Sequence, residues 1–167
     1  MAREDDRLQE KLLDYIEDAH AMEQNVLRML DSMISTTDDC EIAEMLRHHK
    51  EETEQHEQRL SERLEDLGRD PSVLKDAPMI VGALAKSVAD RVRSDTVAKN
   101  ARDGFTTEHM EIASYELLES LAKRVGDLET ADVARTNRAD EEAMAQKIAS
   151  NWDKFLELSL AEEGIRA

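Results

Sequence analysis

Residues 12–33 read LLDYIEDAHAMEQNVLRMLDSM, and this stretch predicts a long helix with one buried side. Its apolar and small residues recur at alternating spacings of four and three, which keeps their side chains on one side of an α-helix. The positions of this repeat are Leu12, Ile16, Ala19, Glu23, Val26, Leu30 and Met33. All of them except Glu23 are apolar or small. We therefore expect an amphipathic helix with a carboxylate in the middle of its buried side.

Similar patterns continue along the chain, with helix breakers between them. The long helices are expected over about residues 4–34, 40–67, 95–125 and 128–161. The polar run 35–39 supplies N-caps for the second helix, and Gly68 followed by Pro71 ends it. Gly126 lies in a short turn between the third and fourth helices. The longer stretch 69–93 is interpreted as a crossover that contains a helix of its own, with Ile80, Leu84, Val88 and Val92 on one side.

The lengths of these connections predict the topology. The two short turns make the first and second helices antiparallel, and likewise the third and fourth. The long connection lets the third helix start parallel to the second, which is typical of ferritin-like bundles. We therefore expect residues 1–167 to form a single all-α domain, a ferritin-like antiparallel four-helix bundle with a long helical crossover between the second and third long helices.

The composition supports helices and restricts the partners. The chain has two prolines, five glycines and 3% aromatic residues, and its net charge is −17. Such a charge argues against binding nucleic acid or an anionic membrane surface and favours cations as ligands. Cys40 is the only cysteine, and the most apolar stretch, 77–85, is too short to span a bilayer. The chain has no signal-like apolar run at its start, so we expect it to be cytoplasmic. We also expect a homodimer without nucleic-acid or membrane partners.

Polar residues interrupt the buried sides of all four helices near mid-height. They are Glu23, His49, Glu52, His56, Glu108, Glu111 and Glu141. Glu23 and Glu52 lie at comparable distances from the first turn, and Glu111 and Glu141 lie at nearly equal distances from the second. We therefore expect acids from separate helices to lie at one level of the bundle.

Buried carboxylates at one level require compensating charge. Each costs several kcal/mol to bury, and like charges repel, so protons or cations must accompany them. Oxygen and imidazole ligands suit iron or manganese in preference to zinc, and two divalent ions bridged by glutamates balance four negative charges. A second interpretation needs no metal. In a chain this acidic some glutamates fall on inward positions by chance, and His49 and His56 then serve as core-edge histidines bonded to Glu23 or Glu52.

Three motifs resemble those of the bacterial YciE/YciF-type ferritin-like stress-protein family, and the resemblance covers nearly the whole chain. They are HKEETEQH at 49–56, EHMEIASY at 108–115, and Asp140-Glu141 in the last helix. The resemblance implies a dimeric ferritin-like bundle associated with bacterial stress responses. By position it places the family's inward acids on Glu23, Glu52, Glu111 and Glu141, with Glu108 and His56 as further metal ligands.

The sequence departs from a regular di-iron carboxylate bundle, in which two helices carry Glu-x-x-His. The residues three positions after Glu52 and Glu141 are Gln55 and Met144. His56 or His49 can substitute on the second helix, whereas the fourth offers no histidine. The leading hypothesis is a ferritin-like metal-binding stress-response protein with two iron or manganese ions acting on oxygen or peroxide, a di-metal oxidoreductase. The alternative is a metal-free helical dimer that serves as an interaction or structural stress protein.

Overall fold

The computed structural model describes residues 2–71 and 96–165, which contain helices and no strand. The helices are α1 (Ala2–Ser35), α2 (Cys40–Asp66), α4 (Thr96–Val125), α5 (Leu128–Ala149) and α6 (Trp152–Glu162). Most of the expected crossover, including its predicted helix with Ile80, Leu84, Val88 and Val92, lies outside the described residues. Within the described parts of the chain, no helix combines the length and hydropathy needed to cross a membrane.

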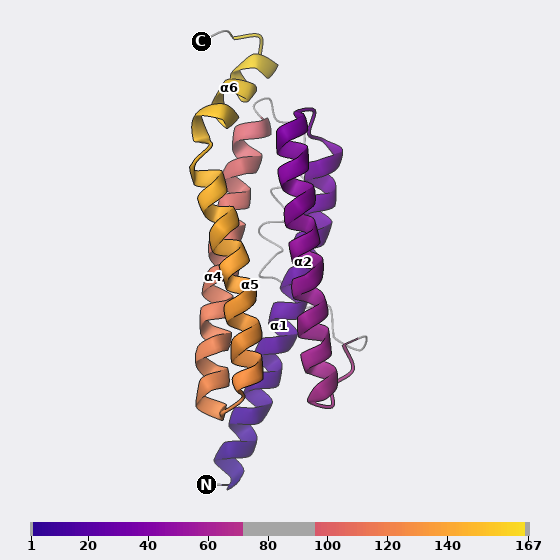
Figure 1. The fold of residues 1–167 in the computed structure, drawn as a ribbon, viewed down its shortest axis with the longest axis vertical. Helices are drawn as coiled ribbons and strands as arrows, with labels where there is room; N and C mark the ends of the chain where they lie inside the picture. Colours follow the sequence, from indigo (N-terminus) through magenta and orange to yellow (C-terminus); the bar gives the residue numbers. More distant parts are fainter. Residues whose placement is uncertain (1, 72–95, 166–167) are drawn as a thin grey trace.

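The helices form a ferritin-like bundle of two antiparallel hairpins (Figure 1). α1 pairs with α2 and α4 pairs with α5, while α1 also contacts α4 and α2 contacts α5. Figure 1 shows that α2 and α4 run in the same direction, as one long connection between them requires. The prediction of an all-α ferritin-like bundle is confirmed.

Local side-chain chemistry sets the ends of these helices. The Asp39 carboxylate accepts hydrogen bonds from the backbone N–H groups of Glu41 and Ile42 at the start of α2. The Asp127 carboxylate does the same for Thr130 at the start of α5. Gly126, between α4 and α5, has a φ of 87°, a conformation that residues with a Cβ rarely adopt. The short turns predicted from the sequence therefore have a clear physical basis.

The last predicted helix, 128–161, is interrupted in the structure. The Ser150 hydroxyl donates to the carbonyl oxygen of Gln146 at 2.8 Å, and the Asn151 side-chain amide donates to that of Lys147 at 2.7 Å. These side chains compete with backbone N–H groups for helical carbonyls, which favours a helix end. A separate helix, α6, therefore follows and packs against α4.

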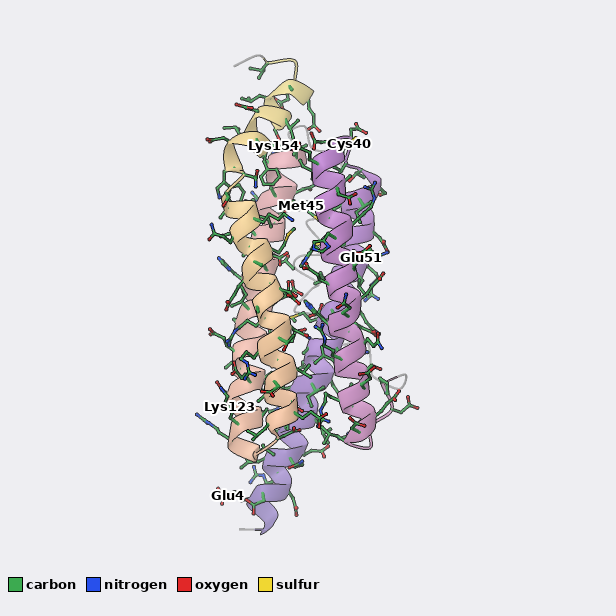
Figure 2. All side chains as sticks on the ribbon, in the orientation of Figure 1. Glu4, Cys40, Met45, Glu51, Lys123 and Lys154 are labelled. Carbon is green, nitrogen blue, oxygen red and sulfur yellow. The ribbon has the colours of Figure 1, made fainter. Side chains whose placement is uncertain are left out.

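The core consists of two apolar clusters with a polar layer between them. The first contains Leu12, Leu13, Ile16, Ala19, Met22, Leu60, Leu64, Tyr115, Leu118, Ala122, Ala131 and Ala134. The second contains Val26, Leu30, Ile42, Leu46, Ala101, Met144, Ile148 and Phe155, and includes contacts with α6. Charged side chains such as those of Glu51 and Lys123 lie on the outside of the bundle (Figure 2). On every long helix, the stretch between the two clusters carries the polar residues predicted from the sequence.

Candidate metal centre

Six acidic and imidazole side chains lie together in the layer between the clusters. They are Glu23 from α1, His49 and His56 from α2, Glu108 and Glu111 from α4, and Glu141 from α5, and each is at most 2% exposed. Each occupies an inward position because the helical repeat that buries the apolar residues on either side also buries the residue between them.

Glu141 lies at the centre of this group. Its Oε1 atom is 2.9 Å from Nδ1 of His56, and its Oε2 atom is 3.5 Å from Nε2 of His49. On one side, His56 Nδ1 is 3.7 Å from Oε1 of Glu23. On the other, His49 Nε2 is 3.4 Å from Oε1 of Glu108. The two triads, Glu23–His56–Glu141 and His49–Glu108–Glu141, therefore share one carboxylate, and the ligand atoms of each lie within 4.8 Å of one another.

These side chains contact one another at ion-pair distances, but many of their polar atoms have no partner in hydrogen-bond geometry. These atoms are Oε2 of Glu23, Nε2 of His49, Nδ1 of His56, Oε2 of Glu108, and both carboxyl oxygens of Glu111 and of Glu141. Buried polar atoms in folded proteins almost always have partners, and unpaired ones cost about 1–3 kcal/mol each. An arrangement of unpaired oxygen and nitrogen atoms around a common centre fits the binding of cations.

Burial makes three of the carboxyl groups hard to ionise. It raises the pKa of Glu23 to about 8, and the negative charge of Glu141 adds to the effect. It also raises the pKa of Glu108 to about 7, even though His49 opposes the shift. The pKa of Glu111 is raised well above its ordinary value by burial and by the repulsion of Glu141, Glu23 and Glu108. The layer therefore takes up protons near neutral pH unless other cations compensate its charge.

Glu141 and the two histidines behave in the opposite way. Burial opposes ionisation of Glu141, but His56 and His49 outweigh it and lower the pKa of this carboxyl. Burial likewise disfavours the charged form of His49, yet Glu108, Glu52 and Glu141 raise its pKa to about 11. For His56, the contacts with Glu141 and Glu23 also overcome burial and raise the pKa. The shared carboxylate is therefore stabilised as an anion.

The outward ring nitrogen of each histidine faces a partly exposed carboxylate. His49 Nδ1 lies 3.4 Å from Oε2 of Glu52, whose side chain is 27% exposed. His56 Nε2 lies 3.0 Å from Oδ2 of Asp140, whose side chain is 36% exposed. Carboxylates in such positions fix the orientation and tautomer of metal-binding histidines. This geometry gives Glu52 and Asp140 a supporting place behind the two rings.

A chain of hydrogen bonds also orients Glu23. The buried Tyr115 hydroxyl donates to the Glu23 carboxylate. The side-chain amide of Asn137 donates to the same hydroxyl at 3.0 Å, and Arg59 donates to the Asn137 oxygen at 2.8 Å. Glu23 is therefore held from the side facing the first apolar cluster.

The structure brings most of the predicted site residues together. Glu23, His56, Glu108 and Glu141 lie in the two triads, and Glu111 is buried beside them. Glu52 lies outside the triads and approaches His48 and His49 instead. His49, which the sequence suggested only as a substitute ligand three residues before Glu52, lies in the second triad. The apolar periodicity gives no signal that Asp140 would lie next to the outward ring nitrogen of His56.

Comparison with known proteins agrees with this fold. A family model described as a domain of unknown function, DUF892, matches residues 7–161. A Xanthomonas campestris protein of known structure is 25% identical and superimposes with a TM-score of 0.79, over 95% of this chain and 99% of that one. The stress protein YciF of Escherichia coli is 20% identical, with a TM-score of 0.69 over 95% and 98% of the two chains. The bacterioferritin of Desulfovibrio desulfuricans, which contains a diiron site, is 19% identical, with a TM-score of 0.74 over 95% and 89%.

Proposed function

The chain belongs to the DUF892 family of YciF-type ferritin-like proteins, and on this premise we propose that its polar layer holds two divalent metal ions, iron or manganese. One observation carries the proposal. Buried oxygen and nitrogen atoms from four helices, without hydrogen-bond partners, converge around Glu141. Without bound cations, burying these groups costs folding free energy, and the groups do not stabilise the fold in any evident way.

Each residue of the layer has a definite place in this site. The two oxygens of Glu141 face different histidines, so this carboxylate would help to hold both ions. Glu111, whose two oxygens have no hydrogen-bond partner, would be a further ligand. Glu23 and His56 would complete one position, and Glu108 and His49 the other. Four carboxylates then balance the four positive charges of two divalent ions.

The donor set matches that of a regular di-iron carboxylate bundle but is distributed differently. Such bundles use four glutamates and two histidines, with one Glu-x-x-His motif on each of two helices. Here both histidines, His49 and His56, come from α2, and they approach Glu141 from two turns of the same helix. The same number and type of ligands is reached without a histidine on α5.

The chemistry proposed for this site is the reduction of dioxygen or peroxide. A bound pair of iron or manganese ions would supply the redox equivalents. The protein's own contribution is to hold the ligands in place and to exclude water. Tyr115 fixes one ligand, Glu23, and the apolar clusters above and below the layer keep solvent away.

We further propose a cytoplasmic, homodimeric stress-response protein, and sedimentation of the metal-free and metal-loaded protein tests its oligomeric state.

Metal titration tests the central claim. Metal-free protein is titrated without oxygen with Fe(II) or Mn(II), followed by calorimetry and elemental analysis. We expect about two ions per chain, and loss of both in Glu141→Ala. The matched control is Glu119→Ala, because Glu119 is also a buried glutamate but its oxygens already bond Lys123 and Arg138. Absence of stoichiometric metal, or equal loss in the control, contradicts the proposal.

A metal-free role as an interaction or structural protein is supported by a different observation. The raised pKa values of His49 and His56 favour imidazolium ions that pair with Glu108 and Glu141. With the remaining acids protonated, the layer approaches charge balance by protons alone. On this alternative, neither chelator nor added metal changes the thermal midpoint, whereas the two-metal site predicts a clear increase with metal.

A further inference from the structure

A partly open cavity of about 50 Å³ lies between the helices on one side of the polar layer. Its walls include residues from all five described helices, and they run from the end of the bundle at Thr36 and Thr37 to the site residue Glu108. Lys154 of α6 forms ion pairs with Asp39 and Glu41 at the start of α2, which fixes α6 against this end of the bundle. Figure 2 shows Lys154 at the same end of the bundle as Cys40. The cavity therefore connects the α6 end of the molecule with one half of the site.

The walls of this cavity are largely apolar and unusually rich in sulfur. Side chains of Met29, Met33, Met45 and Met144 line it, together with aliphatic residues of the second apolar cluster. Thioethers are polarizable and adapt to irregular contents. The lining also includes Asn100 and Glu162. Its apolar part disfavours ions, because a charge placed against it loses its hydration.

The size of the cavity restricts its contents further. A water molecule needs roughly 10–15 Å³ of such space, so a cavity of about 50 Å³ has room for about three to five waters. A diatomic molecule fits, whereas a whole sugar or nucleotide does not. Cavities with largely apolar walls take up small apolar guests such as xenon. Size and polarity therefore agree on a small uncharged ligand.

We propose that this cavity binds a small uncharged molecule of the size of dioxygen and presents it to the His49–Glu108 half of the site. Of the six residues in the polar layer, Glu108 is the one that lines the cavity. The Glu23–His56 half instead meets Tyr115, which belongs to the first apolar cluster. The two halves thus differ in access, and a reaction with the guest rests on the proposed metal site, whereas its binding does not.

Gly104 offers a way to fill the cavity. A Cβ atom added at Gly104 would lie 3.6 Å from Cδ1 of Ile148 and 3.9 Å from Cε of Met33, both ordinary contact distances. Alanine therefore fits at this position, and a leucine would extend into the space. Ala113 on the same helix is exposed, so Ala113→Leu is a matched control that adds bulk away from the cavity.

The test uses metal-free protein labelled with ¹³C at the methionine methyl groups, with NMR spectra recorded under increasing xenon pressure and then under dioxygen. We expect saturable xenon shifts, and paramagnetic broadening by dioxygen, at the four cavity methionines. Met22 and Met110 pack in the other cluster and are internal controls. Gly104→Leu should abolish the response and Ala113→Leu should preserve it. If Gly104→Leu does not fold, Gly104→Ala should still weaken the shifts.

Three results overturn the proposal. They are no response at the cavity methionines, an equal response at Met22 and Met110, and a response that persists unchanged in folded Gly104→Leu. The measurement is independent of the metal titration. A chain that binds two metal ions but shows no xenon response refutes the cavity site alone, and a chain that binds xenon but no metal refutes the proposed function alone.

Discussion

Replacing Glu23 by glutamine should have opposite effects on the metal-free and metal-loaded protein. The Glu23 side chain is fully buried, and its folded-state pKa of about 8 means that it is largely protonated at neutral pH. Glutamine has nearly the same shape, is always neutral, and its amide oxygen can still accept the hydrogen bond from Tyr115. Glu23→Gln should therefore stabilise the bundle without metal, and should weaken metal binding because a ligand is lost.

The magnitude follows from the two pKa values. The carboxyl pKa is raised from the ordinary value of 4.5 to about 8, so folding takes up a proton at any pH between these values. The wild-type protein therefore loses stability as the pH rises through this window, by about 1.4 kcal/mol per unit. At pH 7 the loss is on the order of 3 kcal/mol, equivalent to roughly 6–12 °C in the thermal midpoint of a chain of this size. Glu23→Gln escapes this loss, and its advantage should vanish below about pH 4.5.

Urea and thermal unfolding, followed by circular dichroism, measure this difference. The wild type and Glu23→Gln are compared at pH 5 and 7.5, first with chelator and then with saturating metal. Saturating metal at 100 times its dissociation constant should add about 2.7 kcal/mol per intact site to the wild type. Glu119→Gln is the control, since Lys123 and Arg138 lower the pKa of Glu119 and its replacement should destabilise the protein at neutral pH. The reasoning is wrong if Glu23→Gln is less stable than wild type at pH 7.5 with chelator, or if its advantage is equal at both pH values.

Four further results are expected. Glu52→Gln and Asp140→Asn should each weaken metal binding by about 10–100-fold without changing its stoichiometry, because they orient the histidine ligands from behind; calorimetry checks both numbers. Metal binding at pH 7 should release protons from the layer, so affinity should rise with pH, which titrations in buffers of different ionisation enthalpy detect. Asp127→Ala removes the N-cap of α5 and a partner of Arg63, and should cost about 1–3 kcal/mol in urea unfolding. The Asp127 pKa is lowered, chiefly by Thr130 and Arg63 against the effect of burial, so this cost should be present above the ordinary pKa of 3.8 and disappear as the pH falls through the folded-state value. Chelation should lower the thermal midpoint but leave the far-ultraviolet signal of the helices unchanged, because two apolar clusters hold the bundle on either side of the layer.

The sequence predicts the fold well because clear helix-breaking and turn residues separate its amphipathic segments. Gly126 and the polar run 35–39 fall between long amphipathic segments, and short turns leave antiparallel pairing as the simple outcome. The interruption at Ser150 and Asn151 was missed for a physical reason. Apolar spacing continues through these residues, and their side-chain bonds to helical carbonyls leave no trace in that spacing. Hydrophobic periodicity indicates which side of a helix is buried. It contains no information on side chains that compete with backbone N–H groups for helical carbonyl oxygens.

For the site, periodicity places residues at the correct level but does not resolve neighbours. On α2 the buried stripe passes through His49, Thr53 and His56, so the inward position in the middle belongs to Thr53. Glu52, one residue earlier, lies at the edge of this stripe, where its long side chain reaches His49 and water. The sequence predicts a ligand at Glu52, and in the structure this carboxylate lies outside the two triads and approaches His48 and His49. Which ring nitrogen of a histidine faces inward depends on such partners, and spacing alone contains no information about them.

The position of Met144 links the unusual ligand arrangement with the cavity. In a regular di-iron bundle, the residue three positions after the glutamate of the last helix is a histidine. Here that residue is Met144, which lines the cavity beside Glu108 and packs in the second apolar cluster. His49 supplies an imidazole to the same half of the site from across the bundle. Because the imidazole comes from α2, the wall contributed by α5 is free to be apolar. In the proposed two-metal site, the chain would thus keep four glutamates and two histidines as ligands and would also have an apolar approach to one half of the layer. A histidine at position 144 would instead place an imidazole in that apolar wall.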